Sequence, residues 1–183
     1  MRIVVCITGA SGAVLGVRLL EELRARGVET HAVVSAAGNS ILAHELPDVT
    51  VEADHVHDPN DLAAPIASST YPIDAVVVAP CSAKTLSAVA NDYEHNLVVR
   101  AVSCCLKQER PVILLPRETP YTLAYIENLR NAKLNGCTIL PPNVAYYTRP
   151  GTVDDVTDFF IGRVLDLLGL EHTLYKPWEG MTS

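Results

Sequence analysis

Val112-Ile-Leu-Leu-Pro-Arg-Glu-Thr-Pro120 is an apolar run that ends abruptly in two adjacent and opposite charges, Arg117 and Glu118. An uninterrupted apolar run of this length predicts a strand that is buried on both faces. We expect such a strand to end in charged side chains where these face a cleft. In α/β proteins, ligands bind in the cleft at the carboxyl ends of the strands. The stretch therefore predicts an α/β fold with a ligand site at this end of the sheet.

Two further apolar runs end in the same way. Residues 75–79 are followed by Pro80-Cys-Ser-Ala-Lys-Thr85, and residues 3–8 are followed by Gly9-Ala-Ser-Gly12. The carboxyl ends of parallel strands lie at one edge of a sheet, so the segments that follow them converge. Three strands that lead into small, hydroxylic or charged residues therefore predict one shared site.

Strand and helix patterns alternate along nearly the whole chain. The strands are apolar throughout, which is typical of a parallel sheet covered by helices on both faces. A chain of 183 residues can bury a substantial core, and we expect a single domain over residues 1–183. The pattern predicts strands at 3–8, 29–35, 75–79, 112–115 and 138–140, helices at 13–26, 37–45, 86–90, 96–108, 123–135 and 153–168, and a long loop with a short strand and a short helix at 47–72.

The composition narrows the classes of function. Hydrophobic residues make up 49% and charged residues 19% of the chain, an excess of apolar surface that oligomerisation would cover. No apolar run reaches membrane-spanning length, and Met1-Arg-Ile3 leads into a strand rather than a signal peptide. A net charge of −7 without a basic run argues against nucleic acid as a partner.

The cysteines show no Cys-x-x-Cys spacing. An odd number of thiols in apolar segments fits a reducing cytoplasm rather than a disulfide framework. One of them, Cys81, follows a strand that leads to the expected cleft and is a candidate nucleophile, but no histidine stands near it in sequence, and a core position is the stronger interpretation. The five are Cys6, Cys81, Cys104, Cys105 and Cys137.

A metal centre is not expected from the histidine pattern. His55 and His57 stand beside Asp54 and Asp58, but this segment is so polar that solvation explains it more simply than a metal does. We assign no role to the other four histidines, which are His31, His44, His95 and His172.

The glycine-rich loop Gly9-Ala-Ser-Gly-Ala-Val-Leu-Gly16 allows either a tight turn or a close approach of the backbone to a phosphate or a flat ring. Its spacing is neither the dinucleotide fingerprint nor a P-loop. The next strand ends at Ser35, where a dinucleotide site needs an acid. A phosphate or ring is therefore favoured over a nicotinamide dinucleotide.

Two open interpretations concern side chains at other strand ends. Ser82 and Thr85 can cap the helix that follows them, or they can contact a phosphate or the polar edge of a flavin. Arg117 suits a phosphate or carboxylate and Glu118 can exchange protons, although a surface ion pair between the two is the alternative.

Three cations lie in helical segments. Arg100 and Lys107 are seven residues apart, so they share one face of a helix, either as an anion site or as a solvated stripe. Arg163 stands among apolar residues, where a cation usually meets an anion.

In their joint order these segments resemble the flavin prenyltransferase family (UbiX type, formerly described as a phenylacrylic acid decarboxylase subunit). The resemblance covers nearly the whole chain. It rests on Thr8-Gly-Ala-Ser-Gly-Ala13, Ser35 followed by Glu45, Pro80-Cys-Ser-Ala-Lys-Thr-Leu86, Asn96-Leu97, Arg100-Ala101, Leu106-Lys107, Arg117-Glu-Thr-Pro120, Pro141-Pro142, Ala145-Tyr-Tyr147 and Gly162-Arg-Val-Leu-Asp166.

The resemblance implies a Rossmann-like, flavodoxin-related three-layer sandwich with a mostly parallel sheet, assembled as a homododecamer from trimers. It further implies transfer of a dimethylallyl group from dimethylallyl monophosphate to N5 and C6 of reduced FMN. The reaction needs no metal, and the prenylated FMN then serves UbiD-type decarboxylases. The residues leave open whether the donor is a monophosphate or a pyrophosphate.

Residue roles follow from the same resemblance. It implies that FMN contacts Gly9, Ala10, Ser11, Ser35, Ser82, Ala83, Lys84, Thr85, Arg117 and, from a neighbouring helix or subunit, Arg100. It implies that the substrate phosphate contacts Lys107, Tyr147, Arg163 and Arg117. The proton-handling residues would be Glu118, Glu45 and Ser11.

Three positions depart from the family pattern. Ala36, Leu15 and Tyr146 stand where the family has Lys, Tyr and Phe, respectively. One alternative is an FMN-dependent cysteine decarboxylase of the phosphopantothenoylcysteine type, whose Pro-Ala-Ser-Ala-Asn-Thr signature is replaced here by Pro80-Cys-Ser-Ala-Lys-Thr85. Another is a non-catalytic flavin-binding subunit, which loss of the acids or the phosphate cations would favour, but all are present.

Overall fold

The structure, a computed structural model, describes residues 1–180 and divides into two compact units, Met1–Pro142 and Asn143–Ser183. Each unit is described by itself. The expectation of one domain over residues 1–183 stays a prediction.

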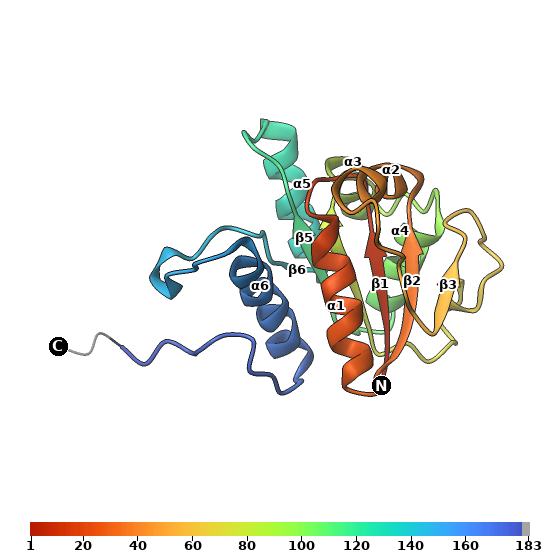
Figure 1. Cartoon of the computed structure of the whole chain (residues 1–183). Helices are drawn as coiled ribbons and strands as arrows, with labels where there is room; N and C mark the ends of the chain where they lie inside the picture. The colour runs from red at the N-terminus through yellow and green to blue at the C-terminus, as the bar shows by residue number, and fades with distance from the viewer. Residues whose placement is uncertain (181–183) are drawn as a thin grey trace. The chain divides into compact units, whose positions relative to one another are not determined.

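The first unit is built on a six-stranded sheet in which every neighbouring pair of strands is parallel. The strand order is β3-β2-β1-β4-β5-β6 (Figure 1). This is a doubly wound Rossmann order, and it confirms the predicted α/β fold. The strands are β1 (Arg2–Ile7), β2 (Glu29–Val34), β3 (His55–His57), β4 (Ala75–Cys81), β5 (Val112–Pro116) and β6 (Thr138–Ile139).

Helices cover both faces of this sheet. Buried residues of α1 and α2 pack with Ile7 of β1, whereas α3, α4 and α5 pack with Val4 and Cys6, which alternate to the opposite face. The long loop carries the short strand β3 and the short helix η1, as predicted. None of the helices within residues 1–180 is long and apolar enough to cross a membrane. The bounds are α1 (Ala13–Ala25), α2 (Ala36–Glu45), η1 (Pro65–Ala67), α3 (Ala83–Ala90), α4 (Leu97–Leu106) and α5 (Leu123–Leu134).

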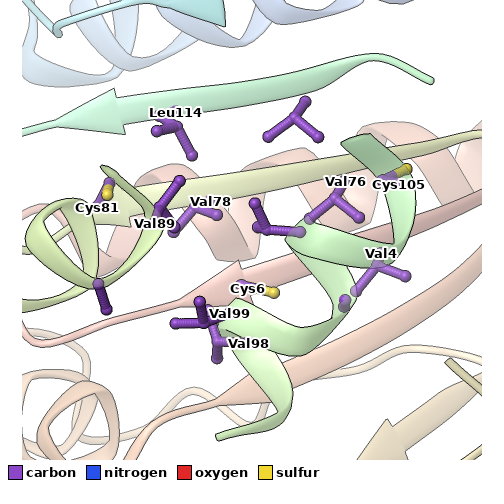
Figure 2. Close-up of a cluster of buried hydrophobic side chains, with 14 of the residues drawn as sticks. Val4, Cys6, Val76, Val78, Cys81, Val89, Val98, Val99, Cys105 and Leu114 are labelled. Carbon is purple, nitrogen blue, oxygen red and sulfur yellow. The ribbon is translucent and has the colours of Figure 1, made fainter. Parts of the chain in front are cut away.

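The larger core lies between the sheet and α3 and α4, as Figure 2 shows. Val76 and Val78 of β4 are two residues apart, so they point to the same face and belong to one buried cluster with Val98 and Val99 of α4. These four side chains are at most 1% exposed. The β-branched Val76 and Val78 therefore favour the strand and also fill the core.

The predicted helix at 86–90 begins earlier than expected. Ser82 caps α3 by accepting a hydrogen bond from the Thr85 amide, so the helix starts at Ala83. The sequence pattern missed this turn because its apolar periodicity begins only at Leu86. The alternative that Ser82 caps its own helix is thereby confirmed.

Gly16 lets α1 approach the sheet closely. A side chain at this position would place its Cβ 2.4 Å from the Ala79 carbonyl oxygen and 2.5 Å from Ile7 Cγ1. Both neighbours belong to buried strands and cannot move aside without shifting the sheet. The glycine therefore sets the distance between α1 and the strands β1 and β4.

The second unit contains η2 (Tyr146–Thr148) and α6 (Val153–Leu168). A capping box begins α6: Thr152 accepts from the Asp155 amide, and the Asp155 side chain accepts from the Thr152 amide. The helix ends at Gly169, whose φ of 70° suits a glycine. The predicted helix at 153–168 is confirmed.

We expect Gly16→Ala to lower the free energy of unfolding by about 1–3 kcal/mol, because the added methyl overpacks the contact between α1 and the sheet. Gly151→Ala is the matched control, since the Cβ there meets only the flexible Asp155 carboxylate at 3.5 Å. Urea denaturation monitored by circular dichroism measures both. Equal midpoints for the two variants would contradict this account of the packing.

Candidate functional site

The strand order of the sheet reverses between β1 and β4, which creates a crevice outside their carboxyl ends. A cavity of about 360 Å³ lies there. The segments after five strands line it, which confirms the predicted convergence of strand ends. Its lining consists of Gly9, Ala10, Ser35, Ala36, Ala37, Pro59, Asn60, Ser82, Ala83, Lys84, Thr85, His95, Asn96, Arg117 and Glu118.

Thr8 joins the loops after β1 and β4. Its hydroxyl donates to the Pro80 carbonyl oxygen at 2.8 Å and accepts from the Ser82 amide at 2.8 Å. The side chain is 1% exposed, so these bonds form within the protein interior. The two walls of the cavity are therefore held at a fixed spacing.

Gly9 brings the first loop against α2. A Cβ at Gly9 would lie 2.4 Å from the Ala37 Cβ, which is shorter than any tolerated contact. The loop backbone consequently lies directly against the first turn of α2, at the rim of the cavity. The glycine acts here through close packing and not through a simple turn.

The amino ends of two helices face the cavity. Ser35 caps α2 by accepting from the Gly38 amide at 3.0 Å, and Ser82 caps α3. The hydroxyl of Ser82 also donates to Thr85 Oγ1 at 3.1 Å. The first turns of both helices line the cavity, so their partial positive charge favours an anion there.

Glu45 caps the third nearby helix, α1. One carboxylate oxygen accepts from the Gly12 and Ala13 amides, each at 2.9 Å. Burial opposes the charged carboxylate, but hydrogen bonds from the Ser11 side chain and these two amides outweigh it and lower the pKa of Glu45. Ser11 and Glu45 therefore meet each other at the start of α1, where Glu45 is ionised at neutral pH.

Arg117 has an unsatisfied donor. Its Nε is buried and has no hydrogen-bond partner among residues 1–180. A buried guanidinium donor without a partner is costly, and a ligand oxygen in the adjacent cavity would remove that cost. Because Arg117 lines this cavity, its side chain indicates where an anionic or polar group binds.

Glu118 lines the same cavity without pairing with Arg117. Its Oε1 accepts from the Thr119 amide at 2.9 Å. Within the described part of the chain, no ion pair joins Arg117 to Glu118, so the alternative of a surface pair between them is wrong. The carboxylate is thus placed at the cavity, where it accepts a backbone hydrogen bond.

Arg100 and Lys107 share one face of α4 and its carboxyl end, as predicted, and both contact Glu94. The Glu94 oxygens lie 2.6 Å from Arg100 Nη1 and 3.1 Å from Lys107 Nζ. Burial opposes the ionised form of Glu94, but hydrogen bonds from Ser103, Arg100 and Lys107 lower its pKa to about 2. The two cations therefore form an anion site that an internal carboxylate already occupies.

Tyr147 and Arg163 belong to the second unit. Arg163 Nη1 lies 3.3 Å from Asp166 Oδ2 and 3.4 Å from the Tyr175 hydroxyl, so Asp166 is the anion expected for this cation. This confirms the expectation that Arg163 meets an anion. Tyr147 lines a cavity of about 510 Å³ in this unit, and its ring packs edge-on against Trp178 at 5.4 Å.

Two groups of site residues escaped sequence reasoning. Glu94 was part of a polar stretch without a pattern, and only its two cationic partners in space show its role. Pro59 and Asn60 line the cavity because they follow β3, a strand too short to recognise by periodicity. His95 and Asn96 complete that wall.

Cys81 is not a candidate nucleophile in this structure. Its side chain is fully buried in the larger core, and that burial raises the pKa of the thiol far above its ordinary value. The thiolate, which is the reactive form, is therefore suppressed. This confirms the interpretation of Cys81 as a core residue.

Comparison with known proteins places the chain among flavoproteins. A model of the Flavoprotein family matches residues 1–165. The chain is 41% identical over 182 residues to "Flavin prenyltransferase UbiX" of Methanocaldococcus jannaschii, covering 97% of this chain and 98% of that protein.

Two solved structures are similar over nearly their whole length. A crystal structure of AnUbiX (PadA1) in complex with FMN and dimethylallyl pyrophosphate has a TM-score of 0.95 and 37% identity, covering 99% of this chain and 98% of that one. A dodecameric FMN-dependent Ubix-like decarboxylase from Escherichia coli O157:H7 has a TM-score of 0.94 and 40% identity, covering 98% and 100%.

We expect Glu45→Gln to lower the free energy of unfolding by about 1 kcal/mol at pH 7, as loss of a helix cap does. The pKa of Glu45 is lowered on folding, so its contribution is present above the ordinary value of 4.5 and is lost as the pH falls through the lowered pKa. Urea denaturation across this pH range measures the difference, which should disappear in acid. Glu127→Gln, an exposed change on α5, is the control and should leave the free energy of unfolding at pH 7 nearly unchanged.

Proposed function

Because the chain belongs to the flavin prenyltransferase family of UbiX-type flavoproteins, we propose that it transfers a dimethylallyl group from dimethylallyl monophosphate to N5 and C6 of reduced FMN. The observation that carries the proposal is the buried and unpartnered Nε of Arg117 at a cavity bounded by two helix amino ends. The names of the relatives indicate the class of reaction, and the cavity is the place where we propose that it occurs.

The residues at the cavity fit FMN. The amino ends of α2 and α3 favour a phosphate, and Gly9 and Ala10 line the same cavity. We propose that the cofactor contacts are those expected from the sequence, with Arg117 Nε donating to a polar atom of the flavin or its phosphate. Reduced FMN would supply the nucleophilic ring positions for the transfer.

The donor phosphate needs fixed positive charge, because the reaction releases an anion and no metal is invoked. We propose Lys107, Arg163 and Tyr147 for this role, with Arg117 at the border of the two ligands. Arg163 is already oriented by Asp166 and Tyr175. Glu94 balances Arg100 and Lys107 in the free chain, so we propose that the donor phosphate competes with it for Lys107.

Proton transfer requires a carboxylate close to the reacting atoms. Glu118 lines the cavity and accepts a hydrogen bond from the Thr119 amide, which makes it the strongest of the three proposed proton-handling residues. Glu45 is held as an anion by Ser11 and two amides, so we propose that this pair keeps the glycine loop in place and supports the chemistry indirectly.

The proposal also covers the oligomeric state of the chain and the protein that receives its product. We propose a homododecamer, which the dodecameric relative supports and which would cover the exposed Leu123, Ile126 and Leu134 of α5. The recipient of prenylated FMN would be a UbiD-type decarboxylase. The five cysteines are free and buried, which supports the expectation of a reducing cytoplasm.

The prenyltransferase is favoured over the two alternatives. The chain is about 40% identical to named flavin prenyltransferases over nearly its full length. Its segment Pro80-Cys-Ser-Ala-Lys-Thr85 also differs from the cysteine decarboxylase signature. A non-catalytic flavin-binding subunit would not need Glu118 at the cavity beside Arg117, whose buried Nε has no partner within residues 1–180.

Arg117→Met should weaken FMN binding roughly 10- to 100-fold, because a charge-assisted hydrogen bond in a buried site is lost. Quenching of flavin fluorescence in a titration measures the affinity. Arg130→Met, which removes an exposed arginine of α5, is the control and should bind FMN like the wild type. Equal affinities of the two variants would remove Arg117 from the flavin site.

The function itself is tested by anaerobic incubation with reduced FMN and dimethylallyl monophosphate, followed by mass spectrometry of the released flavin. A flavin heavier by one C5H8 unit is expected. Glu118→Gln should retain FMN binding but slow this conversion at least about 100-fold, as loss of a general acid or base does. Glu127→Gln should convert at the wild-type rate. An unmodified flavin with intact donor would overturn the proposed reaction.

A further inference from the structure

Four polar residues gather at the β2–β3 edge of the sheet, on strands that pair in parallel register. His31 of β2 pairs with His55 of β3, and Val33 pairs with His57. Glu29 and His31 are two residues apart, as are His55 and His57, so the strand period directs each pair to one face. The sequence showed only His55 and His57, because nothing in it brings β2 beside them.

Three donor atoms of this cluster lie at metal-ligand spacing. Glu29 Oε1 is 3.2 Å from His31 Nε2 and 3.6 Å from His55 Nε2, and all three atoms lie within 4.8 Å of one another. In a tetrahedral zinc site with bonds of about 2.0–2.2 Å, ligand atoms lie about 3.3–3.6 Å apart. Small rotations of the half-exposed His55 would therefore complete the geometry.

His57 supplies the support that such a site needs. Its Nε2 lies 2.8 Å from His31 Nδ1, which leaves the other ring nitrogen of His31 directed toward Glu29. Metal-bound histidines commonly use their second nitrogen for such a hydrogen bond, which fixes the ring. The edge of the Tyr71 ring, 5.8 Å from His31 between centroids, limits its rotation further.

We propose that Glu29, His31 and His55 bind a divalent transition-metal ion of the Zn²⁺ type, with water as the fourth ligand. Two imidazoles and one carboxylate suit zinc. The site is separate from the proposed reaction, which uses no metal, and it does not depend on that proposal.

Arg2 sets the charge of this site. Its Nε and Nη2 lie 2.6 and 2.8 Å from Glu29 Oε1 and Oε2, so the carboxylate is neutralised before an ion arrives. Oε1 has two lone pairs and can accept from Arg2 while it binds the ion. With Arg2 present we expect binding weaker than in a zinc site whose carboxylate is unpaired.

A bound metal would link β3, through His55, to Glu29 and His31 of β2. This edge strand has only three residues, and the chain leads from His57 directly to Pro59 and Asn60, which line the candidate active-site cavity. Binding would therefore stabilise that wall of the cavity. The ion binds the native arrangement only, so it also raises the stability of the chain.

Equilibrium dialysis of the chelator-treated full-length protein against Zn²⁺ tests the proposal. We expect one ion per chain, and a loss of affinity of at least about 10-fold in His55→Asn and His57→Asn. His44→Asn changes an exposed histidine of α2 and should bind like the wild type. Zn²⁺ should raise the thermal midpoint of the wild type and of the control, but not that of His55→Asn.

Co²⁺ distinguishes the proposed ligands from cysteine. A visible spectrum typical of tetrahedral nitrogen and oxygen ligands, lost in His55→Asn, is expected. Intense thiolate charge-transfer bands would place the ion on a cysteine and overturn the site. No Zn²⁺ bound by the folded wild type, or equal binding by folded His55→Asn, would overturn it as well.

Discussion

The structure depends on the position of β1 between β2 and β4, where the strand order of the sheet reverses. Both faces of β1 are buried, and the backbone ladder continues past its end: the Ser35 amide donates to the Ile7 carbonyl and the Thr8 amide to the Pro80 carbonyl. The loops on either side of this point turn in opposite directions. A cavity results at this point, and the small residues Gly9 and Gly16 permit the close packing around it.

The polar groups near the cavity make hydrogen bonds that cap helices of the fold, independently of any ligand. Ser35 and Ser82 satisfy amides at the starts of α2 and α3, and Glu45 does the same for α1. The Glu45 carboxylate therefore neutralises the partial positive charge at the amino end of α1. The first turns of α2 and α3 carry only hydroxyl caps, and they face the cavity. This difference directs an anionic ligand toward the latter two helices.

The cations divide into paired and unpaired groups. Arg100 and Lys107 contact Glu94, and Arg163 contacts Asp166, whereas the buried Arg117 Nε has no partner within residues 1–180. A ligand that meets Arg117 gains a full hydrogen bond at a donor that has already lost its water. A ligand that meets Lys107 must first compete with an internal carboxylate, which makes that contact selective for strongly charged groups.

The amino-acid sequence by itself determined the alternation of strands and helices, the parallel sheet and the convergence of strand ends on one site, because these follow from local periodicity and from where apolar runs stop. It also predicted the contributions of Gly9, Ser35, Ser82 and Arg117 to one cavity. Only the tertiary structure decided which charges have partners. Glu94 beside Lys107, and His31 beside His55, are contacts between segments far apart along the chain, and no local pattern encodes them, since side-chain pairing depends on the register of strands and the packing of helices.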